Sequence, residues 1–150
     1  MMDVSNNKLG GGYMRISWLI ILVASLVILS ACADTKGKTQ SLQEFYKDAN
    51  IENVNKVIIQ DGSTGLSKTI TNQEQIDAFL ALINEIVFTP QENQEGRVGW
   101  RYGITLYDGK KEFSFTLNHI NDTYYDSNPA ILPIVDDYYK QLEIMEEYID

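Results

Sequence analysis

The chain has 150 residues, 44% of them hydrophobic, and a formal net charge of −9. This length leaves room for one ordinary domain with its own core after a targeting segment is removed. The acidic surface repels phosphate backbones and anionic lipid headgroups, which argues against nucleic-acid binding and against membrane attachment through a basic face.

The first predicted element is a secretory signal. Arg15 precedes an apolar run, 16–28, of about 13 residues, which is the length of a signal-peptide core and shorter than the ~20 residues that span a bilayer. The run ends in Leu29-Ser30-Ala31-Cys32, an apolar and two small residues ahead of the sole cysteine. With no second thiol, an internal disulfide is excluded.

This four-residue segment resembles the bacterial lipobox. The resemblance implies that signal peptidase recognises Leu29, Ser30 and Ala31, cleaves before Cys32, and leaves Cys32 lipid-modified. It predicts a signal peptide over 1–31, a lipidated cysteine and polar tether over 32–41, and a single domain over 42–150. An uncleaved membrane anchor with an incidental cysteine is the alternative.

The segment ahead of Arg15 is polar and contains Gly10-Gly11-Gly12 just before Met14. Because glycine codons begin with GG, the triplet is consistent with a translated ribosome-binding tract. We therefore hypothesise that translation starts at Met14, with a longer natural n-region from Met1 as the alternative.

Four elements are expected in the first half of the domain. A short helix is predicted over 41–50, followed by β-branched strands over 54–59 and 66–70 that flank a Gly-rich turn. Thr71 and Glu74 have the spacing of a capping box, with Thr71 as the N-cap of a helix whose apolar residues continue to Val87. Pro90 and the polar residues after it are expected to form a loop.

The second half is dominated by an aromatic hairpin. Trp100, Tyr102, Ile104 and Leu106 alternate with polar residues and are expected to face the core, as are Phe113, Phe115 and Leu117 beyond the Asp108-Gly109-Lys110 turn. A shorter strand over 122–125 and a final helix from Pro133, with an apolar stripe reaching Met145 and Ile149, complete the chain. The order β-β-α-β-β-β-α predicts the α+β class: an antiparallel sheet of about five strands with two main helices packed on one face.

Residues suited to catalysis or metal binding are sparse. Cys32 is assigned to the anchor, and His119 is interpreted as a loop histidine in water. His119, Asp122, Asp126 and the Asp136-Asp137 pair offer hard ligands, but they lack calcium-loop spacing, and the two adjacent helical aspartates diverge by about 100°. We expect no enzyme, no metal site and no cofactor.

The remaining candidate is a binding surface. In each of the pairs Tyr124-Tyr125 and Tyr138-Tyr139 one ring is expected to face the core and the other to be exposed. The polar sheet face, together with the basic residues near it, is the expected docking surface. Its members are Arg97, Arg101, Thr105, Ser114 and Thr116.

The chain as a whole resembles the small uncharacterised lipoproteins of Bacillus-like bacteria, most firmly over 15–32. The resemblance implies an accessory or binding protein on the extracytoplasmic face of the cell membrane, held by lipid on Cys32. Its expected partner is another envelope protein or a glycan, not nucleic acid. A small-ligand or cation sensor based on the Asp-rich segment 119–137 is one alternative, and a cell-wall hydrolase is the other.

Overall fold

The computed structural model describes residues 37–149. The predicted start at Met14, the signal and the lipobox with Cys32 lie outside these residues. In the described part, no helix has the length and apolar character that a membrane crossing needs. The fold there is α+β, as predicted, with three helices: α2 (Leu42–Asp48), α3 (Gln73–Ile83) and α4 (Ile131–Gln141).

Over residues 37–149 the sheet has nine strands, so the prediction of about five was wrong. They are β1 (Gln40–Ser41), β2 (Lys56–Asp61), β3 (Leu66–Ile70), β4 (Val87–Pro90), β5 (Tyr102–Asp108), β6 (Lys111–Thr116), β7 (His119–Ile120), β8 (Thr123–Asn128) and β9 (Glu147–Tyr148). Strands β1, β7 and β9 have two residues each, which is too short to show an alternating pattern in the sequence.

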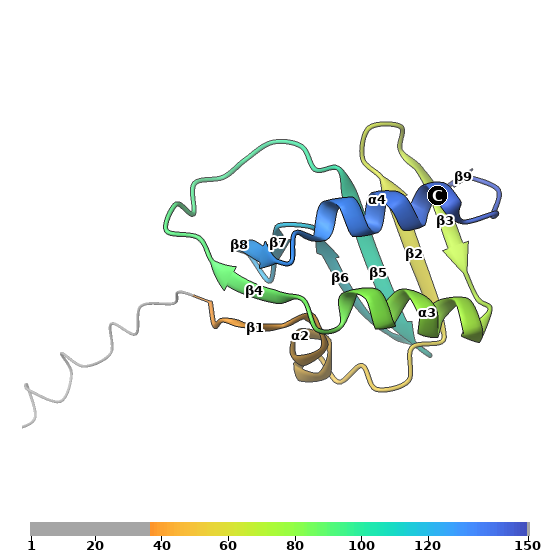
Figure 1. Ribbon diagram of the computed structural model, residues 1–150, viewed down its shortest axis with the longest axis horizontal. Helices are drawn as coiled ribbons and strands as arrows, with labels where there is room; N and C mark the ends of the chain where they lie inside the picture. The colour runs from red at the N-terminus through yellow and green to blue at the C-terminus, as the bar shows by residue number, and fades with distance from the viewer. Residues whose placement is uncertain (1–36, 150) are drawn as a thin grey trace, which may run out of the picture. The chain divides into compact units, whose positions relative to one another are not determined.

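The strand order is β1-β4-β8-β7-β6-β5-β2-β3-β9, and each of these pairings is antiparallel. Helices α3 and α4 lie side by side across one face of the sheet (Figure 1). Helix α2 joins the same core at the other end of the sheet, because Phe45 contacts the rings of Phe88 and Tyr125. The opposite face of strands β2, β5 and β6 receives none of these three helices.

The predicted aromatic hairpin is confirmed. Strands β5 and β6 pair from Gly103↔Thr116 to Asp108↔Lys111, and Gly109 occupies the turn with a φ of 61°. The inward residues Tyr102, Ile104 and Leu106 are buried. Trp100 is an exception, because it lies outside the strand and its side chain is 42% exposed.

The helix predicted from the Thr71 cap to Val87 was too long. Helix α3 ends at Ile83, and Val87 to Pro90 form β4 between β1 and β8. The N-cap of α3 is Asn72, whose side chain accepts a hydrogen bond from the Gln75 backbone amide. The assignment of Thr71 as the cap was therefore also wrong. The apolar residues Ile86, Val87 and Phe88 fit a helix and a buried strand equally well by sequence, and pairing of this segment with two neighbouring strands decides for the strand.

A complete capping box occurs at α2 instead. The Ser41 hydroxyl accepts from the Glu44 amide at 3.3 Å, and the Glu44 carboxylate accepts from the Ser41 amide at 2.7 Å. The second contact is the main reason that the pKa of Glu44 is lowered. These bonds satisfy N–H groups that a helix start otherwise leaves unpaired.

Replacement of the cap should therefore be measurable. We expect Ser41→Ala to reduce the free energy of unfolding by about 1 kcal/mol, the usual effect of losing a serine cap. Urea unfolding followed by circular dichroism checks this value. Thr71→Ala is the control, because Thr71 is exposed and does not cap α3; equal losses in the two variants would contradict the assignment.

The final helix is shorter than its predicted stripe. Pro133 lies in the first turn, as expected, but α4 ends at Gln141, and Met145 and Ile149 are exposed. After Leu142 the chain turns back, and its residues Glu147 and Tyr148 pair with the edge of β3. The residues that α4 buries are Ile131, Val135 and Tyr139. Val135 and Tyr139 each lie one position after a residue of the predicted stripe, which contained Ile134 and Tyr138.

Candidate functional site

The face of the sheet opposite α3 and α4 presents cross-strand rows of side chains. The register places Ile58, Thr105 and Ser114 side by side in one row. A second row runs through Gln60, Gly103, Thr116 and His119. Side chains in such rows alternate strictly with the buried ones, because successive residues of a strand point to opposite faces.

Trp100 fills the space that glycine leaves in the second row. A Cβ atom at Gly103 would lie 3.3 Å from the indole Cζ3, and one at Gly62 would lie 2.6 Å from Cε3 and 2.2 Å from the Trp100 carbonyl oxygen. The indole thus packs against two residues that have no side chain, while much of it stays exposed. The prediction of a core Trp100 was wrong, because the residue precedes β5 and its ring packs on the outer face.

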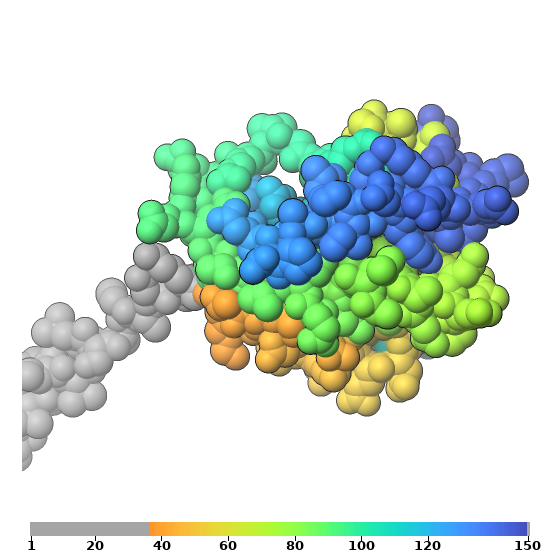
Figure 2. All heavy atoms as spheres, in the orientation of Figure 1, coloured from red at the N-terminus to blue at the C-terminus, as the bar shows by residue number. Residues whose placement is uncertain are grey.

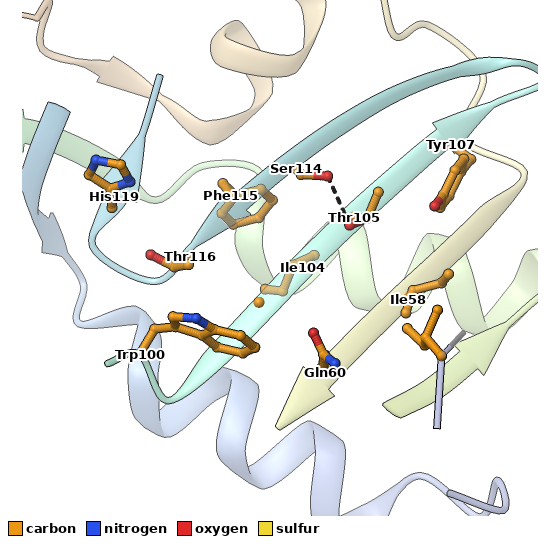
Figure 3. Close-up of a pocket in the computed structure, with 12 residues that line it drawn as sticks. Ile58, Gln60, Trp100, Ile104, Thr105, Tyr107, Ser114, Phe115, Thr116 and His119 are labelled. Carbon is orange, nitrogen blue, oxygen red and sulfur yellow. Dashed lines mark hydrogen bonds between the residues drawn. The ribbon is translucent and has the colours of Figure 1, made fainter. Parts of the chain in front are cut away.

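A groove of about 420 Å³ follows these rows (Figure 3). The indole lies at one end, between Gln60 and the side chains of Thr116 and His119. Within the part of the chain that the structure describes, the side chains that line the groove belong to aromatic, aliphatic, hydroxyl, amide and imidazole types, and none of them is Asp, Glu, Lys or Arg. In a chain with a net charge of −9, this is an uncharged surface.

The polar groups of the groove keep unused hydrogen-bonding capacity. The hydroxyls of Thr105 and Ser114 bond to each other at 2.9 Å, so one of the two hydroxyl hydrogens stays free. The Gln60 amide nitrogen donates to the Gly65 carbonyl at 3.3 Å, which leaves its oxygen available. The His119 ring lies 4.6 Å from that of Tyr124. His119 is thus a half-buried residue of β7, not the predicted loop histidine in water.

The five residues predicted for the docking surface separate into two groups. Thr105, Ser114 and Thr116 line the groove together, whereas the two arginines do not. Arg97 lies over the Tyr124 ring, 4.9 Å from its centroid, and Arg101 is held by carboxylates at the start of β5. The sequence pattern placed Trp100 in the core and assigned neither Gln60 nor His119 to this surface. The available signal was Gly103, the one position in the polar row of β5 without a side chain.

Arg101 belongs to a network of charges that ties the β2–β3 turn to α4. Its guanidinium donates to Asp61 at 2.5 Å and to the Ser63 hydroxyl at 2.6 Å. Tyr102 donates to Asp136 at 2.8 Å, and Lys140 pairs with the other oxygen of Asp136. Burial and the bond to Asp136 raise the pKa of Tyr102 to about 12, so Tyr102 stays a donor at neutral pH.

The same network should make the stability of the fold depend on pH in the acidic range. Burial alone would raise the pKa of Asp61, but the Ser63 bonds and the Arg101 ion pair outweigh it and lower the pKa. Hydrogen bonds from Lys140 and Tyr102 lower the pKa of Asp136. A carboxyl whose pKa is lower in the folded state than in the unfolded state stabilises the fold at pH values above its unfolded-state pKa, which is about 3.9 for aspartate. This stabilisation is lost as the pH falls through the folded-state pKa.

We therefore expect Tm to fall as pH drops below about 4, and Asp61→Asn to weaken that dependence while lowering Tm at neutral pH. Thermal melting from pH 7 to pH 2.5, followed by circular dichroism, measures both effects. Asp137→Asn is the control, because Asp137 is exposed on the same helix as Asp136. A pH profile that is the same in wild type and Asp61→Asn would contradict this role of Asp61.

A second hollow of about 520 Å³ lies between the segment 91–101, β8 and the start of α4. Figure 2 shows it as an opening beneath the arched segment. Gln94 holds the segment by bonding both the amide and the carbonyl of Tyr124. Trp100 borders this hollow as well as the groove, but the lining here includes the charged residues Arg101 and Asp126.

In residues 37–149 no group of three or more His, Cys, Asp or Glu side chains is placed to hold a metal ion. Of the ligands considered for the segment 119–137, His119 contacts Tyr124, Asp126 accepts from Gln91, and Asp136 is paired with Lys140. Comparison of the chain with protein-family models, with curated proteins and with solved structures found no match. The geometry of the groove is therefore the basis for a functional proposal.

Proposed function

We propose that this chain is a lipid-anchored protein on the extracytoplasmic face of the cell membrane that binds another envelope component and is not an enzyme. The observation that carries the proposal is the groove on the sheet face opposite α3 and α4. It combines an exposed indole with polar groups that still have free donors and acceptors. Ligand sites typically join an aromatic or apolar surface to a few oriented polar groups.

The charges of the fold favour binding over catalysis at this groove. Acid–base catalysis requires titratable groups within reach of a substrate. His119 and Tyr107 are the titratable side chains among the described lining residues, and the pair of carboxylates that glycoside cleavage needs does not accompany them. The buried Asp61 and the half-buried Asp136 are both engaged by basic side chains, and neither lines the groove. The hydrolase and the cation sensor gain no support from this arrangement.

The membrane part of the proposal rests on the lipobox pattern at Leu29 to Cys32. Metabolic labelling with an alkyne fatty acid should mark the wild-type chain, and Cys32→Ala should lose the label. A wild-type chain that carries no label would contradict the anchor.

The binding part is tested by crosslinked capture from intact cells. Ser114→Arg places a bulky cation in the groove at an exposed position, and Thr71→Arg adds the same charge at an exposed site before α3. We expect Ser114→Arg to lose the envelope component that wild type and Thr71→Arg retain. Equal recovery with all three chains would contradict binding through the groove.

A further inference from the structure

The chemistry of the groove indicates which ligand it takes, if it is the binding site proposed above. Among residues 37–149, the lining contains no Lys or Arg that would pair with phosphate or carboxylate, and no Asp or Glu that would pair with an amine. A charged ligand would leave its water shell without gaining an opposite charge, which is unfavourable. The net charge of −9 adds repulsion against polyanions. An uncharged ligand is therefore favoured.

The packing of Trp100 against Gly62 and Gly103 indicates that the ligand has a flat apolar surface. The indole rests on Gly62 and Gly103, which hold it against the sheet, and is 42% exposed. A large apolar ring that is fixed on one side and open on the other binds flat groups with little loss of conformational freedom. The apolar face of a sugar ring has this form.

The polar groups beside the indole suit hydroxyl partners. Thr105 and Ser114 together offer one free donor and several lone pairs, and the Gln60 oxygen accepts. On the other side of the indole, His119 adds an imidazole, and Thr116 adds a hydroxyl that donates to Asn118 at 3.5 Å and can still accept. Groups that both donate and accept match sugar hydroxyls, which do the same.

We propose that the groove binds an uncharged oligosaccharide, with one sugar ring stacked on Trp100 and neighbouring hydroxyls bonded to Gln60, Ser114 and Thr116. This inference rests on the proposed function, because it names the ligand class of the same groove. Trp100 contributes the stacking surface, and the polar rows set the orientation of the sugar.

The test uses the full chain with Trp18→Phe, so that Trp100 is the only tryptophan. The protein is kept in a phosphocholine detergent, because maltoside and glucoside headgroups are themselves uncharged sugars. Emission is recorded during titration with the tetramer of N-acetylglucosamine and with cellotetraose. Polygalacturonate and an uncharged hexapeptide are titrated in parallel. We expect a saturable change in Trp100 emission with at least one of the neutral tetrasaccharides and none with the polyanion or the peptide.

Calorimetry on variants then assigns the contacts. We expect Trp100→Ala to weaken binding by about tenfold or more, as for an aromatic anchor. Thr116→Val, which removes a hydroxyl and preserves the shape of the side chain, should weaken it several-fold with an unchanged melting temperature. Val98→Ala is the matched control, since Val98 is fully exposed two residues from Trp100 and does not line the groove.

Three results would contradict the proposal, two of them on the sugar class and one on the stacking surface. Binding of the polyanion or the peptide at Trp100, without either neutral sugar, overturns the sugar class. Because Trp100 borders the second hollow as well, the same titration of Ser114→Arg then shows whether that binding occurs in the groove. A lack of response to all four probes also overturns the sugar class, and the capture experiment with Ser114→Arg then decides separately on the groove. Sugar affinity that is unchanged in Trp100→Ala overturns the assignment of the stacking surface.

Discussion

Replacement of Lys68 by alanine should reduce the free energy of unfolding by about 3 kcal/mol, the largest loss expected for a charged residue in this fold. Lys68 lies on the inner face of β3 and is buried. Its ammonium donates to the carbonyl oxygens of Tyr139 at 2.8 Å and Leu142 at 2.7 Å. These carbonyls belong to the C-terminal end of α4, where a helix has unpaired acceptors and partial negative charge.

Lys68→Met separates the charge from the packing. Methionine retains most of the apolar stem of lysine. The loss of unfolding free energy in this variant, expected to be about 2 kcal/mol, therefore measures the effect of leaving the two carbonyl oxygens without a donor. Lys110→Met is the control, because Lys110 is exposed in the β5–β6 turn. Urea unfolding of the three variants gives the comparison. If Lys68→Met is as stable as wild type, the ammonium is not the group that holds the end of α4.

Gly62→Ala should be the second large effect, about 2 kcal/mol, although Gly62 is exposed. An added Cβ would lie 2.2 Å from the Trp100 carbonyl oxygen, which is a backbone atom and cannot rotate away. The β2–β3 turn must then move away from Trp100, and the bond from the Gly62 amide to the Arg101 carbonyl, 2.8 Å, is lost. In the Trp18→Phe chain, Trp100 emission should shift to the red as the indole loses its contacts with Gly62 and Gly103.

Gly96→Ala provides the matched control. No atom lies within 4 Å of a Cβ at Gly96, so this variant should retain wild-type stability or gain a few tenths of a kcal/mol from a less flexible unfolded chain. Unfolding curves and emission spectra of the two variants are compared in the same buffer. A Gly62→Ala chain with wild-type stability and spectrum would contradict the close packing of Trp100 on the turn.

Much of the candidate site could be predicted from the alternation of two strands. Period two over 102–117 separates buried Tyr102, Ile104 and Leu106 from Thr105, Ser114 and Thr116, and the Asp-Gly turn sets the register between the strands. The amphipathic pattern of each element also placed one tyrosine of each pair in the core. Tyr125 is the buried member of the strand pair, and in the helix pair it is Tyr139, whereas the predicted stripe contained Tyr138. Their partners, Tyr124 and Tyr138, are half-buried instead of exposed.

The position of Trp100 could not be predicted in this way. By spacing, Trp100 continues the inner row of β5, but β5 begins only at Tyr102, so Trp100 lies outside the strand. The two glycines against which the ring packs come from separate strands: Gly62 directly follows β2, and Gly103 is the second residue of β5. Arg101 was likewise placed on the polar face, whereas Asp61, forty residues earlier, draws its guanidinium into an ion pair. Contacts between residues distant in sequence decided both positions.

By itself the sequence determined the α+β class, the aromatic hairpin and the polar character of the outer sheet face, because these follow from the local period of apolar residues. Only the tertiary structure decided the nine-stranded order, the conversion of 87–90 to a strand and the use of Lys68 at the end of α4. Two-residue strands and a buried lysine have no local signal, since each is stabilised by backbone groups that the fold brings from elsewhere in the chain. The groove at Trp100 arises for the same reason, from a tryptophan and two glycines that folding brings together.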